Sequence, residues 1–178
     1  MPPKFKIIEE YEDYTPPVRV STAVELLMKH VPPEHVEGLR KVVLTNSARV
    51  LKTHKGKYTF DGKRMRAADL RGFYGNGHIC LIMDRILDHY PQSFLLVPMI
   101  KTLAIGEILY HELGHHIHER AEPGFRDNRE AVADEWSDEL LISFFEKHYW
   151  FLAKILLAYK KLLHPVVVRI VRLFRRSS

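Results

Sequence analysis

The sequence predicts an α+β fold, in which a small antiparallel sheet packs on one long helix and further helices follow it. The Asp61-Gly62 pair joins two short extended runs, a pattern typical of a β-hairpin. The apolar run at residues 78–83 indicates a strand. Residues 93–120 and the residues from about 128 onward indicate two long helices.

The first part of the chain combines an arm, a helix and a strand. Residues 1–17 are flanked by prolines and acidic in the middle, so we expect an extended, solvated arm. Thr22 and Glu25 form a capping-box pattern, which predicts a helix that runs to about residue 30 and ends before two prolines. Residues 39–45 contain a β-branched apolar run and predict a strand.

The hairpin that follows, within residues 50–66, is rich in lysine and arginine. A basic hairpin can contact nucleic acid, but we interpret this one as a solvated face. The strand at 78–83 begins after an Asn76-Gly77 turn. It contains Cys80, the one cysteine of the chain, which we interpret as a small buried hydrophobic residue.

Helices are expected from residue 84 onward. The first covers residues 84–90 and ends at a proline. The second covers residues 93–120, with Pro98 tolerated in its first turn. The third begins near Asn128 and is expected to continue towards Leu163.

The second of these helices contains the motif His111-Glu112-Leu113-Gly114-His115. Residues four apart share a helix face, so His111 and His115 can direct their imidazole nitrogens at one metal ion. Zinc is commonly bound by two imidazoles and a carboxylate, with a water in the fourth position, and lowers the pKa of that water towards about 7. Glu112 is close enough to act as the general base. This combination predicts amide hydrolysis.

The third helix offers the missing carboxylate. Glu130 follows a Glu122-Pro123-Gly124 turn that lets the chain reverse, and we expect it to be the third zinc ligand. Asp134 lies one helical turn after Glu130, where it can hold the distal N–H of a ligand histidine. The alternative is a pair of amphipathic helices with solvated histidines and acids.

This pattern resembles the gluzincin metallopeptidases. The residues from His111 to His115, with Glu130, Ala133, Asp134, Trp136 and Leu140-Leu141, are similar to the compact ImmA/IrrE-type zinc proteases over about residues 100–142. Asp134 stands where that family commonly has Asn, and Trp136 where it commonly has Phe. The resemblance implies zinc ligands at His111, His115 and Glu130 and a catalytic base at Glu112.

The resemblance also implies a position for the substrate. In such peptidases a strand before the active helix lies beside the substrate, so the free edge of residues 78–83 is expected to hold an extended peptide. Tyr74 and His78 are near this strand, but we assign neither to the oxyanion. His116 and His118 are expected to face solvent, with His118 off the face that carries His111 and His115.

The net charge of +5 is unevenly distributed. Eight of the 27 Lys and Arg residues lie in residues 147–178, which contain no acid, so residues 1–146 hold 19 basic and 22 acidic side chains. In helical projection these basic residues form a stripe on an otherwise apolar segment, which Pro165 should kink. We therefore expect a compact domain at 1–146 and a basic amphipathic helical extension at 147–178.

The extension has three possible roles: packing on the domain or on a second copy, lying on a membrane surface, or binding an anionic macromolecule. Its charges disfavour a full membrane span, and we do not expect nucleic acid to be the partner. A single cysteine and an N-terminus without an apolar leader indicate a cytoplasmic protein, with peripheral attachment to a membrane as an option.

Three functions remain open at this point. The first is a zinc-dependent endopeptidase that acts on a peptide or protein substrate. The second is a non-catalytic protein with a zinc fold, which would act through its basic C-terminal helix at a membrane surface or on another macromolecule. The third is a regulated protease that stays latent until a partner or stimulus arrives.

Overall fold

A computed structural model describes residues 5–53, 57–60, 63–121 and 128–151. The chain forms two compact units, residues 1–142 and residues 143–178. The first unit contains the sheet and all the elements of the predicted site. Among the described residues, no helix combines the length and apolar character needed to cross a membrane.

The first unit is built on a four-stranded mixed sheet with the order β1-β2-β6-β5. The strands are β1 (Lys6–Glu10), β2 (Lys41–Thr45), β5 (Gly72–Gly75) and β6 (His78–Ile82). β1 pairs with β2 and β2 pairs with β6 in parallel, whereas β5 and β6 are antiparallel. The α+β class is therefore confirmed.

The prediction of an antiparallel sheet is wrong. Two pairs are parallel, β1 with β2 and β2 with β6, and β1 lies within the residues expected to form a solvated arm. Thr45 Oγ1 donates to the carbonyl of Glu10 at 2.8 Å, and the Asn46 side chain exchanges two hydrogen bonds of 2.8 Å with the backbone of Glu12. These contacts hold the N-terminal segment to the end of β2, and parallel pairing follows because a helix returns the chain between the two strands.

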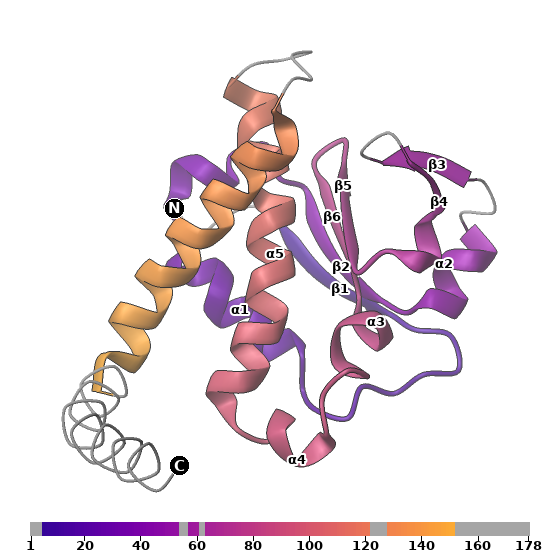
Figure 1. The fold of residues 1–178 in the computed structure, drawn as a ribbon, viewed down its shortest axis with the longest axis horizontal. Coiled ribbons are helices and arrows are strands. Elements are labelled where there is room, and N and C mark those ends of the chain that lie inside the picture. Colours follow the sequence, from indigo (N-terminus) through magenta and orange to yellow (C-terminus); the bar gives the residue numbers. More distant parts are fainter. Residues whose placement is uncertain (1–4, 54–56, 61–62, 122–127, 152–178) are drawn as a thin grey trace, which may run out of the picture. The chain divides into compact units, whose positions relative to one another are not determined.

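That helix is α1 (Ser21–His30), and it packs on the sheet beside α5 (Pro98–Ala121), as Figure 1 shows. Alternate residues of the central strands are fully buried on one face: Val42, Leu44, Ile79 and Leu81. The helix predicted from Thr22 is confirmed, but its capping box is not formed. Val20 occupies the N-cap position, and no side chain caps the helix.

The hairpin prediction is confirmed by β3 (Lys57–Phe60) and β4 (Lys63–Arg66), which pair antiparallel. The sequence did not predict α2 (Ser47–Thr53), or the short 3-10 helices η1 (Pro33–Val36) and η2 (Ala67–Asp69). A small core cluster lies here, with Val50, Ala68 and Ile82 at its centre and Leu70 and Phe73 packed against it.

The helix expected at 93–120 is two helices. α4 (Gln92–Leu95) ends with Leu96 as its C-cap, and α5 starts at Pro98. Proline suits the first position of a helix, where no N–H donor is needed, and it disfavours helical backbone in the residue before it. The preceding helix, α3 (Met83–Leu87), is shorter than the predicted 84–90.

Residues 129–151 are helical and run from the first unit into the second. Within the second unit, Phe144 stacks on His148 with ring centroids 4.4 Å apart. Residues 152–178, with the predicted basic stripe and the Pro165 kink, lie outside the described residues.

Candidate metal centre

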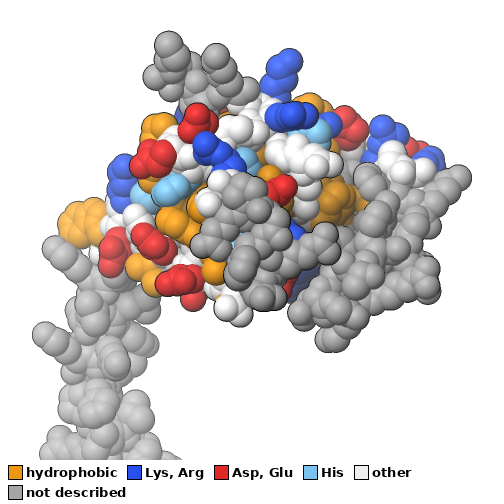
Figure 2. Space-filling view, turned by 90° about the horizontal axis from the view of Figure 1, so that it is seen from above, with side chains coloured by type: hydrophobic (Ala, Val, Ile, Leu, Met, Phe, Trp, Pro, Cys, Tyr) orange, Lys and Arg blue, Asp and Glu red, His pale blue; other side chains and the backbone are white. Residues whose placement is uncertain are grey.

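The two motif histidines lie on one face of α5, as their spacing predicts. Their rings are 4.8 Å apart and nearly perpendicular. The His111 side chain is 26 % exposed and that of His115 11 % exposed. A metal ion can therefore reach both rings from solvent. On the face of the molecule in Figure 2, histidine side chains reach the surface beside acidic ones.

The glycine of the motif determines which element faces these histidines. A Cβ on Gly114 would lie 2.7 Å from Cα of Ala133, so only glycine lets the helix of residues 129–151 come this close to α5. Ser137 Oγ donates to the carbonyl of Glu107 at 3.1 Å, one turn further along. The two segments therefore run antiparallel, and residues near 130 lie beside the histidines.

This helix packing places Glu130 beside the two histidines. Its Oε2 lies 3.4 Å from Nε2 of His111 and 3.6 Å from Nε2 of His115. One ligand atom from each of these three residues lies within 4.8 Å of the others. Zinc–ligand distances of about 2.0–2.2 Å and tetrahedral angles place two ligand atoms roughly 3.3–3.6 Å apart. The three residues suit zinc in donor type, and the two distances from Glu130 to the histidines fall within this range.

Asp134 lies at the other nitrogen of His111, with Oδ1 2.9 Å from Nδ1. A carboxylate accepts hydrogen bonds, so Nδ1 carries the proton and donates it. In the neutral imidazole, Nε2 then offers its lone pair towards Glu130 and His115. This is the contact that the spacing of Glu130 and Asp134 predicted.

His115 is held in the neutral form that binds metal. Burial lowers the pKa of His115 to about 4, and the proximity of His111, Arg129 and His118 adds to the effect. At neutral pH the ring is uncharged. Its Nδ1 is buried and has no hydrogen-bond partner within the described part of the chain.

Glu112 is the most buried acid of the group, with 6 % of its surface exposed. Burial, with a smaller contribution from the Glu130 carboxylate, raises the pKa of Glu112 to about 8, and an interaction with the Tyr74 backbone opposes the rise. A Cβ on Gly72 would lie 3.1 Å from Oε1 of Glu112, so the carboxyl group lies directly against β5. A carboxyl group with a pKa near neutrality suits proton transfer.

The strand beside the site is not the predicted one. β6, which covers residues 78–82, pairs with β2 on one side and β5 on the other, so it has no free edge. β5 is the edge strand, and it contacts α5. The sequence did not predict β5 because its four residues include two glycines, which are uncommon in strands.

The other histidines differ from expectation. His116 and His118 are buried, at 2 % and 6 % exposure, so the prediction that they face solvent is wrong. His118 also shares the face of His111, because seven residues are nearly two helical turns. Tyr74 directs its hydroxyl to Nδ1 of His116 at 3.1 Å, while His78 lies at the far end of the β5–β6 turn.

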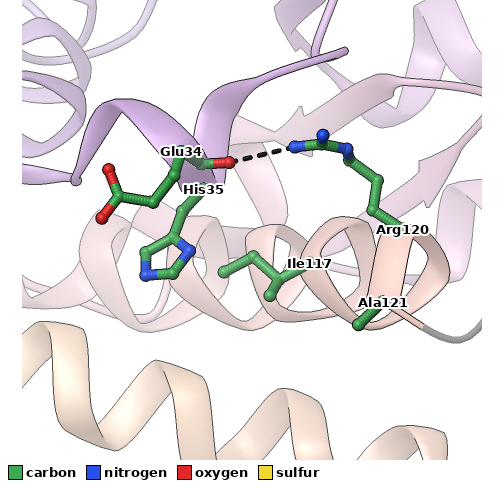
Figure 3. A pocket seen from close by; sticks show the side chains of 5 residues that line it. All are labelled: Glu34, His35, Ile117, Arg120 and Ala121. Atoms are coloured by element: carbon green, nitrogen blue, oxygen red, sulfur yellow. Dashed lines mark hydrogen bonds between the residues drawn. The ribbon is translucent and has the colours of Figure 1, made fainter.

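A separate cavity of about 220 Å³ lies between η1 and the end of α5 (Figure 3). It is lined by Glu34, His35, Ile117, Arg120 and Ala121. Arg120 donates to the carbonyl of Glu34 at 3.0 Å and to the Glu37 carboxylate at 2.9 Å. None of the residues that fit a zinc ion lines this cavity.

No protein-family model, curated protein or solved structure matches the chain. The geometry of the site therefore carries the functional argument.

Proposed function

We propose that the protein is a zinc-dependent metallopeptidase that hydrolyses peptide bonds. The observation that carries this proposal is the convergence of His111, His115 and Glu130 from two helices, with one ligand atom of each within 4.8 Å of the others. Two neighbouring carboxyl groups add to it. Asp134 orients His111, and Glu112 is buried beside the three predicted ligands.

Two imidazoles and one carboxylate favour zinc over the harder cations, which prefer oxygen ligands. When bound, zinc supplies Lewis acidity for the scissile carbonyl and lowers the pKa of a coordinated water. His111 and His115 would hold the ion through ring nitrogens, and Glu130 would hold it through a carboxylate oxygen.

Glu112 acts as the general base that accepts a proton from the attacking water, and it then donates this proton to the leaving amine. The interaction with the Tyr74 backbone orients its carboxylate, and burial contributes most to raising its pKa to about 8. We place an extended peptide along the open edge of β5, because this strand is unpaired on one side among the described residues and lies next to Glu112.

Metal content, measured by elemental mass spectrometry, tests the ligand set. We expect near-stoichiometric zinc in the wild type and little in His111→Ala or Glu130→Ala. His89→Ala is the matched control, because His89 is exposed and outside the group. Zinc that is lost with His111→Ala but kept in Glu130→Ala would move the third ligand to another acid, with Asp134 next. A folded wild type that binds no supplied zinc would contradict the proposal.

Cleavage of unfolded casein tests the reaction. Glu112→Gln should retain zinc and lose cleavage, because the amide cannot accept the proton. Glu107→Gln, an exposed change on the same helix, should cleave as the wild type does. Cleavage by Glu112→Gln at the wild-type rate would contradict the assigned base.

A further inference from the structure

His116, the residue after the second predicted ligand, is buried and fully hydrogen-bonded. Its Nε2 lies 3.0 Å from the carbonyl of Glu37, and its Nδ1 lies 3.1 Å from the hydroxyl of Tyr74. A carbonyl accepts hydrogen bonds, so Nε2 carries the proton of the neutral ring. Nδ1 is then the acceptor, and the Tyr74 hydroxyl donates to it.

Tyr74 is itself held at several points. Its hydroxyl accepts a hydrogen bond from the Gly77 N–H at 3.3 Å, and its ring meets the His116 ring edge-on at 5.4 Å. Its backbone N–H interacts with the Glu112 carboxyl group and lowers the pKa of that group. One residue of β5 therefore contacts α5 twice, through its side chain to His116 and through its backbone to Glu112.

The ladder of β5 explains why this backbone N–H is available. Ile82 N–H donates to the carbonyl of Arg71 at 2.8 Å, which makes that pair a bonded one. Bonded pairs alternate in an antiparallel ladder, so Phe73 and Gly75 also bond to β6. Gly72 and Tyr74 direct their backbone groups to the open edge, which is the edge beside Glu112.

Glu112 and His116 are four residues apart and share the face of α5 that meets this edge. The fit is tight, because a Cβ on Gly72 would lie 2.8 Å from Cγ2 of Ile108 and 3.1 Å from Oε1 of Glu112. A shift of β5 would therefore move the hydrogen-bond donor of Glu112 together with the strand.

We infer that half-buried Tyr74 and buried His116 are a positioning pair, which locks the edge strand β5 onto α5 and thereby holds the Glu112 carboxylate in place. The effect on catalysis by Glu112 rests on the proposed peptidase function, whereas the attachment of β5 to α5, the lock, does not. Neither residue touches the three predicted zinc ligands through a hydrogen bond in the described structure, so both act through Glu112 and the strand.

The test compares Tyr74→Phe with Tyr110→Phe in the full-length chain with zinc supplied. Tyr110 is the matched control, because its buried hydroxyl donates to the carbonyl of Leu27 at 2.9 Å, between α5 and α1. Each variant loses one hydroxyl that is hydrogen-bonded within the protein. If the lost hydroxyl only lowered the overall stability, both variants would show the same change in amide exchange on β5.

Amide hydrogen exchange, monitored by NMR, measures directly how firmly β5 is held to α5. In Tyr74→Phe we expect the amides of Phe73 and Gly75 to exchange about tenfold faster, the factor that corresponds to one lost hydrogen bond. Tyr110→Phe should leave them unchanged. His116→Gln, which keeps a donor and an acceptor, should exchange more slowly than Tyr74→Phe. Equal exchange in Tyr74→Phe and Tyr110→Phe would overturn the lock.

Turnover of unfolded casein tests whether the Tyr74–His116 pair affects catalysis through Glu112. Zinc content is measured on the same samples. We expect kcat to fall in Tyr74→Phe at unchanged zinc content and to hold in Tyr110→Phe. Faster exchange with unchanged kcat would overturn the link to Glu112. A wild type without zinc or cleavage would defeat the proposed function, and the exchange measurement would still decide the lock.

Discussion

Single residues decide whether the group around His111 can hold an ion. Asp134 is the sharpest case, because its carboxylate fixes which nitrogen of His111 carries the proton. We expect Asp134→Asn to weaken zinc binding by about 10- to 100-fold, since a neutral amide is a weaker acceptor and can orient the ring either way. Competition with a chromogenic chelator measures this change.

Asp138→Asn is the control for this prediction. Asp138 is exposed and lies one turn further along the same helix. Similar zinc affinity in the two variants would show that the contact with His111 does not support the site.

The burial of Glu112 predicts that the folding stability of the metal-free protein depends on pH. The pKa of Glu112 is about 8 when folded, against 4.5 as its ordinary value, so the folded state binds the proton more tightly. The stabilisation is complete below about pH 4.5 and is lost as the pH rises through about 8. Glu112→Gln cannot ionise, so its Tm relative to the wild type should be higher at pH 9 than at pH 4.5.

Thermal unfolding in excess chelator checks this prediction, with Glu107→Gln as the exposed control. Other titrating groups cancel, because each variant is compared with the wild type at the same pH. A Tm difference that is the same at both pH values would mean that Glu112 is not buried as the structure has it.

At the scale of elements, the helix of residues 129–151 depends on two glycines of α5. A Cβ at Gly114 would meet the backbone of Ala133 at 2.7 Å, whereas one at Gly106 would meet the side-chain ends of Leu141 and Leu27 at 3.0 and 3.1 Å. Alanine favours helix over glycine by about 1 kcal/mol at either position. The steric cost therefore decides the outcome.

We expect Gly114→Ala to lower Tm and zinc affinity together, because the backbone of the second helix must move and take Glu130 with it. Gly106→Ala should be milder, since leucine side chains can shift. Chemical denaturation and zinc titration of both variants check the comparison. Equal effects would argue against a backbone contact at Gly114.

The sequence predicted the elements, and which residues lie together at the candidate site, better than it predicted the pairing of the strands. The hairpin and α1 follow from local patterns, and the site follows from residue types at helical spacings. β1 was missed because its partner is 35 residues away and its own residues are half-buried or exposed. The burial of His116 was missed for a similar reason, since its partners lie in β5 and after η1.

At the scale of the whole molecule, the charge and the predicted site are in different parts of the chain. Every residue assigned to the site lies within residues 1–142, whereas eight basic residues lie in 147–178. Removing that segment changes the formal net charge from +5 to −3, because 19 basic and 22 acidic side chains remain. Any attraction to an anionic partner should therefore weaken sharply, with little change at the site.

We accordingly expect a chain that ends at residue 146 to bind zinc with the stoichiometry of the full chain and to cleave unfolded casein. The predicted ligands come from α5 and from the first two turns of the next helix, and contacts at Gly114 and Ser137 hold these two helices together. Elemental analysis and the casein assay, run on both chains, check this. Loss of zinc from a truncated chain with intact circular dichroism would show that residues 147–178 complete the site.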